Sequence, residues 1–146
     1  MPQPARLIWA NNLHHPAGVT VTGTGLSDPI DLTAVEAVFL SVVVGDLPQG
    51  MSDGHAEGPQ LAVTLQVCEA GGTWLPAAIL EPRYVEYPRE PWAAGPFTDC
   101  TSVGLGATVP MVLPPTARIR WDAYRWANGS MQPVSFGRTV ISLYGR

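Results

Sequence analysis

Three histidines and two nearby carboxylates are the side chains to test first for metal chemistry. Asp53, His55 and Glu57 alternate, so an extended backbone would point one imidazole and two carboxylates the same way, a set that can hold a metal ion. Two flanking glycines leave this group poorly preorganised, which favours a solvated loop. His14 and His15 are adjacent and would point to opposite faces of a strand. The sequence therefore predicts no metal site.

The residues that could act in catalysis are equally dispersed. Cys68 and Cys100 have no histidine at a spacing typical of a nucleophile and its base, and both are expected to be buried or half-buried thiols, with a bridge between them left open. The glycine-rich stretch 23–25 lacks the lysine and the following helix of a phosphate-binding loop. Glu86 and Glu90 lie among Tyr, Pro and Arg in an expected surface loop. A cupin-type enzyme would need histidines on neighbouring strands, and the three histidines lie outside the best strands. We therefore expect no catalytic residue, no enzyme activity and no cofactor.

Aromatic and arginine residues offer a different chemistry, that of macromolecular contact. Of the five tryptophans, Trp74 and Trp121 are predicted to be in the core, and Trp92 and Trp126 near the surface, where aromatic rings favour protein interfaces and sugar platforms. Three arginines beside Tyr124 and Trp126 would suit an interface hot spot, and we predict it from Arg120, Arg125 and Arg138. The full set of predicted interface residues is Leu7, Ile8, Trp9, Trp92, Arg120, Tyr124, Arg125 and Trp126.

Short strands must position these side chains. Fifteen glycines and fifteen prolines divide the chain into pieces rich in Val, Ile, Thr, Trp and Tyr, and many of the pieces alternate with a period of two. The clearest, Gln60–Cys68, places Leu61, Val63, Leu65 and Val67 on one face. Strands are expected at 18–22, 36–44, 60–68, 73–80, 83–87, within 101–113, at 117–126 and at 133–144, with a loop at 23–31. The sequence predicts an all-β fold, a β-sandwich or jelly roll of about eight short antiparallel strands, with a small barrel as the other arrangement.

The chain is expected to have two parts. Residues 1–16 form an extended N-terminal arm that carries the apolar cluster Leu7-Ile8-Trp9, with room for one strand. Residues 17–146 form the β-sandwich or jelly-roll domain. The arm could add its strand to the sheet edge of a neighbouring molecule. Asn128-Gly129 suits a tight hairpin turn, because both central residues of such a turn need positive φ.

Charge and hydropathy exclude several classes of partner. The net charge is −4, all eight basic residues are arginine, and only 14% of residues are charged. A basic stripe for phosphates is missing, so nucleic-acid binding is not expected. The longest apolar stretch, 34–44, is far shorter than the ~20 residues of a membrane helix. The N-terminus lacks the apolar segment of a signal peptide, so synthesis in the cytoplasm of the producing cell is expected.

The strand pattern resembles that of a known family. The segment QLAVTLQVC (60–68) is followed by a Gly-Gly turn and Thr73-Trp74, and ARIRWDAY (117–124) precedes an Asn-Gly turn and the closing VSFGRTVISLY (134–144). This pattern resembles the small β-sandwich virion proteins of tailed bacteriophages, including capsid decoration proteins. The resemblance covers the strands within 18–44, 60–80 and 117–144, while 45–59 and 81–116 depart from it as insertions.

The resemblance implies a non-enzymatic structural protein on the outer surface of a virion. Such a protein would assemble as a homotrimer, bind the major capsid protein and stabilise the shell. A carbohydrate- or receptor-binding β-sandwich module of a phage tail is the alternative, and it would use Trp92, Trp126 or Tyr84 to stack on a sugar.

Overall fold

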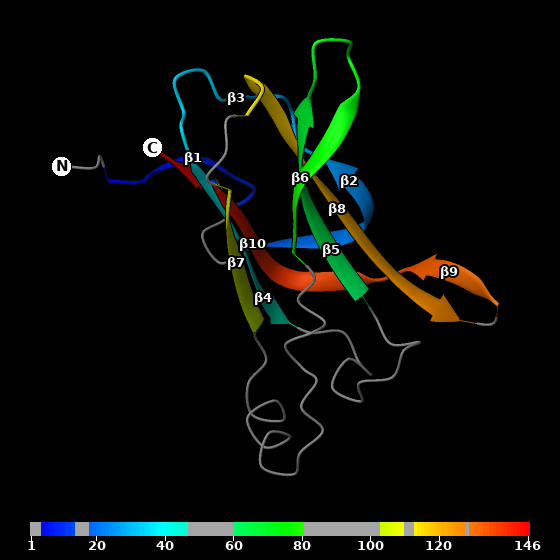
Figure 1. Cartoon of the computed structure of the whole chain (residues 1–146). Helices are drawn as coiled ribbons and strands as arrows, with labels where there is room; N and C mark the ends of the chain where they lie inside the picture. The colour runs from blue at the N-terminus through cyan, green and yellow to red at the C-terminus, as the bar shows by residue number, and fades with distance from the viewer. Residues whose placement is uncertain (1–3, 14–17, 47–59, 81–102, 110–112, 128) are drawn as a thin grey trace.

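Ten antiparallel strands make up the fold in a computed structural model of the whole chain, which describes residues 4–13, 18–46, 60–80, 103–109, 113–127 and 129–146 (Figure 1). No helix occurs within these ranges. The predicted all-β fold is thus confirmed. The strands are β1 (Arg6–Ala10), β2 (Val19–Leu26), β3 (Ile30–Asp31), β4 (Val38–Asp46), β5 (Gln60–Cys68), β6 (Trp74–Leu80), β7 (Val103–Val109), β8 (Thr116–Ala127), β9 (Ser130–Pro133) and β10 (Ser135–Gly145).

The strands form one continuous, curled sheet in the order β6-β5-β8-β2-β10-β4-β7. The curled sheet forms two layers, sheet A and sheet B. Sheet A contains β7, β4, β10, β1 and the first half of β2, and sheet B contains β6, β5, β8, β3, β9 and the second half of β2. Every pairing is antiparallel, which allows each layer to present one face to the core and the other outward.

The chain passes from one sheet to the other within β2 and again directly before β10. In β2, residues 19–22 pair with β10 and residues 23–26 pair with β8. The change occurs at Gly23, whose φ of +61° few other residues adopt readily. The chain crosses again between β9 and β10, where the Val134 amide donates to the carbonyl of Ala123 at 3.1 Å. These crossings hold the two layers together over one core.

The sequence prediction of a loop at 23–31 is therefore wrong in part. Residues 23–26 continue β2, and β3 occupies Ile30–Asp31. The glycines that favoured a loop have a packing role, because the Trp121 ring lies where a side chain at Gly25 would be, across the β2–β8 pair. Glycine in a strand often marks such a close approach. The segment predicted as a strand at 83–87 lies outside the described residues.

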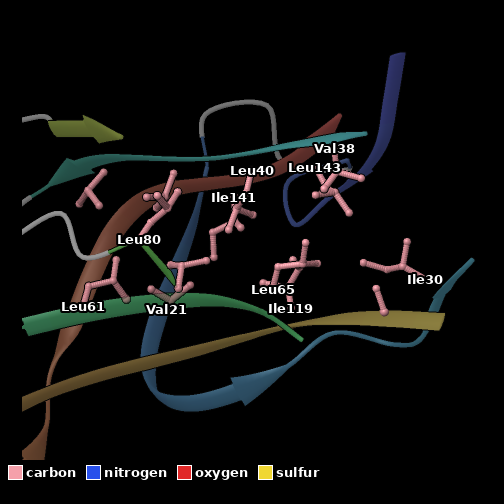
Figure 2. Packing of buried hydrophobic residues seen from close by; sticks show 14 of the residues in the cluster. Val21, Ile30, Val38, Leu40, Leu61, Leu65, Leu80, Ile119, Ile141 and Leu143 are labelled. Atoms are coloured by element: carbon pink, nitrogen blue, oxygen red, sulfur yellow. The ribbon is translucent and has the colours of Figure 1, made fainter. Parts of the chain in front are cut away.

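The core lies between the two sheets, and alternation along the strands builds it (Figure 2). Alternate residues of β4 and β5 are buried, as their patterns predicted, and β8 and β10 add Ile119, Ile141 and Leu143. Each such side chain contributes roughly 1.5–3 kcal/mol on burial. The best-buried apolar residues of the four long strands are Leu40, Val42, Val44, Leu61, Val63, Leu65, Ala117, Ile119, Ala123, Phe136, Ile141 and Leu143.

The N-terminal segment is a strand of sheet A. β1 pairs with the end of β10, and Ile8 and Trp9 pack against the core. Asn11 then fastens the strand, because its Nδ2 donates to the Thr139 carbonyl at 3.1 Å and its Oδ1 accepts from the Ile141 amide at 2.9 Å. The predicted arm of residues 1–16 is described only over residues 4–13, and there it carries the strand Arg6–Ala10. The strand is paired within its own chain, so strand addition to a neighbour would need it to leave β10 or to use its other edge.

Candidate interaction surfaces

The outward side of sheet A, called face A below, is apolar. Strand register places Leu7, Tyr144 and Phe39 in one row across β1, β10 and β4, and Val140 beside Val43 in a second row. Leu7 is 46% exposed, Phe39 40% and Val43 46%. The Phe39 and Tyr144 rings lie with centroids 6.4 Å apart at 49°, a tilted arrangement that aromatic pairs favour.

Small residues separate the two rows. Ser41 pairs with Ser142, and on the neighbouring strand Gly106 and Gly104 lie opposite Ser41 and Val43. Ser142 is buried although its place in the alternation is outward. Among the described outward residues of these rows none is charged. The rows of face A therefore consist of uncharged side chains, and the large side chains of Leu7, Tyr144 and Phe39 lie together at one end.

An ion pair between Arg138 and Asp46 lies at the other end of face A. Arg138 donates through Nη2 and Nε to the two carboxylate oxygens of Asp46 at 2.8 and 2.9 Å, and this fork holds the pKa of the Asp46 carboxyl below its ordinary value. Arg138 has a φ of +43°, and its backbone occupies the space that a side chain at Gly18 would need. Both charged side chains are more than half exposed, so the pair contributes little stability.

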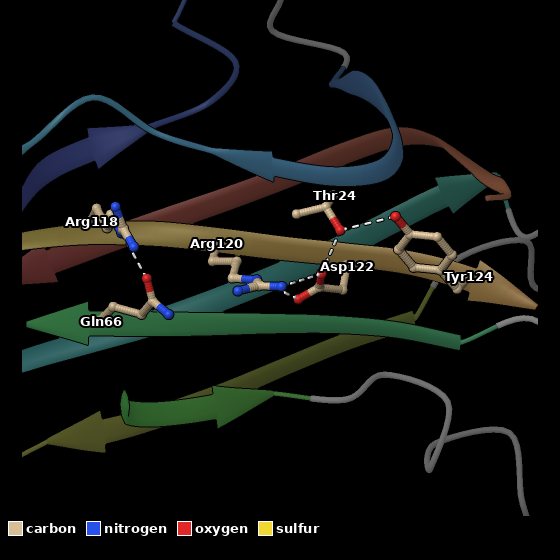
Figure 3. Close-up of polar contacts among 6 residues, drawn as sticks. All are labelled: Thr24, Gln66, Arg118, Arg120, Asp122 and Tyr124. Carbon is tan, nitrogen blue, oxygen red and sulfur yellow. Dashed lines mark hydrogen bonds and ion pairs between the residues drawn. The ribbon is translucent and has the colours of Figure 1, made fainter. Parts of the chain in front are cut away.

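The outward side of sheet B, called face B, carries a network of polar side chains along β8 (Figure 3), beside the exposed apolar side chains of Leu26 and Ile79. Arg120 donates to both oxygens of Asp122 at 3.0 and 3.2 Å. Thr24 Oγ1 on β2 donates to Asp122 Oδ1 at 2.7 Å and lies 3.0 Å from the Tyr124 hydroxyl. Because the Thr24 proton is used on Asp122, Tyr124 is the donor in that second bond. The four side chains thus form one chain of hydrogen bonds along the strands.

A second cluster on face B surrounds Arg118. Its Nε donates to Gln66 Oε1 on β5 at 2.7 Å, and its guanidinium lies 4.1 Å from the ring centroid of Trp74 on β6. The aromatic ring and the amide together fix the guanidinium plane. Trp74 was predicted to be in the core. It is half-buried on the outward side instead, because it enters β6 opposite Cys68, an outward position of β5.

The hairpin of β8 and β9 extends face B beyond the body of the sheet (Figure 1). Trp126 pairs with Met131, and the two are 44% and 51% exposed. Gly129 in the turn has a φ of +80°, as the predicted tight turn requires. The next pair inward, Tyr124 and Pro133, joins the hairpin to the hydrogen-bonded chain of face B.

The predicted interface residues fall into separate places. Arg120 and Tyr124 belong to the same network on face B, and Trp126 lies two residues further along β8. Arg125 alternates to the other side of the hairpin, opposite Gln132. Arg138, predicted to join the same cluster, lies on face A. Of the N-terminal group, Leu7 is exposed on face A, whereas Ile8 and Trp9 pack against the core. Trp92 lies outside the described residues.

Sequence reasoning missed the residues that link these groups. Thr24, Gln66 and Trp74 reach β8 only through strand pairing, and they lie 44 to 98 positions from the β8 residues that they contact. The alternation of Arg118, Arg120 and Asp122 was the available signal. It identified the outward face of β8 without identifying what lies beside it.

Other chemistry is sparse within the described part of the chain. There, no group of three or more His, Cys, Asp or Glu residues could hold a metal ion. The three histidines, Asp53 and Glu57 lie outside it. Cys68 is a free, half-buried thiol 3.6 Å from the Glu69 carbonyl, and Cys100 is outside the described residues. The same ranges contain no helix that is long and apolar enough to cross a membrane.

Comparison with known proteins identifies no relative of this chain. No family model matches the chain, and no curated protein matches it.

Proposed function

We propose that this chain is a non-enzymatic structural protein of a bacteriophage virion, which binds the outside of the capsid as a homotrimer and stabilises the shell. The observation that carries the proposal is face A, where Leu7, Phe39 and Val43 remain 40–46% exposed in rows of uncharged side chains. Contiguous apolar surface of this kind marks protein interaction sites. The resemblance of the strand pattern to that of phage decoration proteins is the reason for proposing the major capsid protein as the partner.

The composition of face A suits repeated protein contact. Desolvating uncharged side chains costs little compared with desolvating ion pairs, and apolar area gains about 25 cal/mol per Å² when it leaves water. The small residues Ser41, Gly104 and Gly106 let an opposing surface approach the backbone closely. The tilted pair of Phe39 and Tyr144 supplies a rigid aromatic contact of the kind that dominates interface energies.

The size of face A favours attachment by several copies together. Strands lie ~4.8 Å apart and rise ~3.4 Å per residue, so its two rows across four strands cover roughly 300 Å². A standard protein complex buries about 800 Å² per partner. One copy would therefore bind weakly, and an oligomer that engages several sites would gain by multivalency. The small area of face A therefore favours attachment to the capsid as an oligomer over attachment as a monomer.

Co-sedimentation with purified empty capsids tests the proposal. The double variant Phe39→Asp, Val43→Asp places two charges on face A and is expected to reduce capsid binding at least tenfold, because the charges must be desolvated on docking. Ile79→Asp is the matched control, since Ile79 is 55% exposed on face B. Equal loss of binding in the control, or normal binding of the double variant, would contradict the role of face A.

A further inference from the structure

The geometry points to face B as a binding site for a glycan that carries a carboxylate, a role separate from capsid attachment through face A. The site is centred on Arg118 and continues along β8 through Arg120, Asp122 and Tyr124 (Figure 3). The rise of the strand spaces the Cα atoms of these four residues roughly 7 Å apart, a span of about 20 Å. That span accommodates an extended ligand of several sugar units.

The first argument is charge. Asp122 neutralises Arg120, whereas no described carboxylate forms an ion pair with Arg118. Face B therefore carries a local positive charge on a chain whose net charge is −4. A guanidinium presents a planar fork of donors that matches a carboxylate. One such arginine among neutral groups selects a single anionic group on a polar ligand, and a polyphosphate would need the basic stripe that this chain lacks.

The second argument is preorganisation. Arg118 is fixed by Gln66 at 2.7 Å and by the Trp74 ring at 4.1 Å, and its Nε is the atom used on Gln66. The binding groups sit on β5 and β8 in the middle of sheet B, and ordering them on ligand binding costs little entropy. The Nη groups of Arg118 are left as the donors for a ligand carboxylate.

The third argument is the mixture of donors and acceptors beyond Arg118. The Gln66 amide, the Asp122 carboxylate and the Tyr124 hydroxyl lie in line on the same face. Sugar hydroxyls both donate and accept, so such a row can bind several of them, while a purely apolar ligand would leave these groups unpaired. Asp122 and Arg120 already satisfy each other, which keeps the site intact without ligand.

An array of uronate- and sialate-containing glycans, printed beside neutral glycans of the same length, tests this inference with the full-length chain. Binding is expected to carboxylated glycans only, and calorimetry with the best array ligand then measures the dissociation constant. Arg118→Gln should weaken binding at least tenfold. Arg118→Lys keeps the charge and loses the fork, so it should weaken binding severalfold while preserving the fold.

Controls separate this site from face A. Arg138→Gln removes an exposed arginine from face A and should bind glycan normally. The double variant Phe39→Asp, Val43→Asp should also bind glycan normally, even where it fails to bind capsids. The inference is overturned if no carboxylated glycan binds at millimolar concentration, if neutral glycans bind equally well, or if both Arg118 variants bind like the unaltered protein.

Discussion

Face A and face B cover the same core and differ in almost every outward residue. On face A, the large outward side chains of β4 and β10 are Phe39, Val43, Val140 and Tyr144, and an ion pair lies at the end of the sheet. On face B, polar side chains run along β8 and bond to one another. A strand that alternates can change its outward residues freely while its inward residues stay apolar. The two outward surfaces of the fold thus differ: the rows of face A are uncharged, whereas β8 on face B carries hydrogen-bonded polar side chains.

The largest expected effect separates the N-terminal strand from the rest of sheet A. Deleting residues 1–13 removes the packing of Ile8 and Trp9 and both Asn11 hydrogen bonds. We expect a loss of roughly 4 kcal/mol or more in the free energy of unfolding, since each large apolar side chain contributes about 1.5–3 kcal/mol. Urea titration followed by circular dichroism measures this. Unchanged stability would show that residues 1–13 act as a detachable arm.

The next effect tests whether the two faces share one core. Leu40→Ala lies beneath face A and Leu65→Ala beneath face B, and both side chains are fully buried. Each substitution should lower the free energy of unfolding by about 3 kcal/mol through lost transfer energy and a cavity. Tryptophan fluorescence and circular dichroism should report the same transition in both variants. Two separate transitions would mean that the sheets unfold independently.

A smaller effect is expected from the network of face B. Asp122→Ala removes the acceptor of Arg120 and of Thr24. The loss should be about 1 kcal/mol, since hydrogen bonds and partly exposed ion pairs contribute on that scale. Thermal unfolding measures it, and Thr24→Val, which removes one of the bonds, serves as the milder comparison. A loss above about 3 kcal/mol would show that face B is part of the stabilising core.

The smallest effect concerns the ion pair of face A and its response to pH. The pKa of Asp46 is lowered in the folded chain by Arg138, so its contribution to stability is present above the unfolded pKa and is lost as pH falls through the folded pKa. Urea midpoints should fall below about pH 4. Asp31 and Glu69, whose pKa values are also lowered, add to the fall. Arg138→Gln should show a slightly flatter pH profile, and an identical profile would remove Arg138 as a cause.

Local patterns were enough to predict much of this fold. Alternation identified β4, β5 and β8 and the inward side of each, because one buried face imposes a period of two. The continuation of β2 past Gly23 was missed, since the need for glycine opposite Trp121 arises only when β2 and β8 pair. Sequence reasoning also grouped Arg138 with Arg120, because only strand pairing shows that the two arginines lie on different faces. The bulge and ion pair of Arg138 depend on β4 and β2, which are distant in the chain.

The candidate surfaces follow the same division. Arg120, Tyr124 and Trp126 were predicted from composition and from their place on one strand. Leu7 was predicted as an interface residue, but the rest of face A was not, since Phe39 and Val43 look like ordinary strand residues until register brings them into rows beside it. Pairing across strands is a tertiary property, and a single sequence constrains it weakly.

The solution mass of the full-length chain tests the central claim, that the chain attaches to the capsid as a trimer with face A directed at the shell. Light scattering after size-exclusion chromatography, over a range of concentrations, should give three chain masses both for the unaltered protein and for the double variant Phe39→Asp, Val43→Asp, because face A is kept for the capsid. Ile79→Asp should also remain a trimer. A monomer at every concentration, or a double variant that no longer forms trimers, would contradict the account.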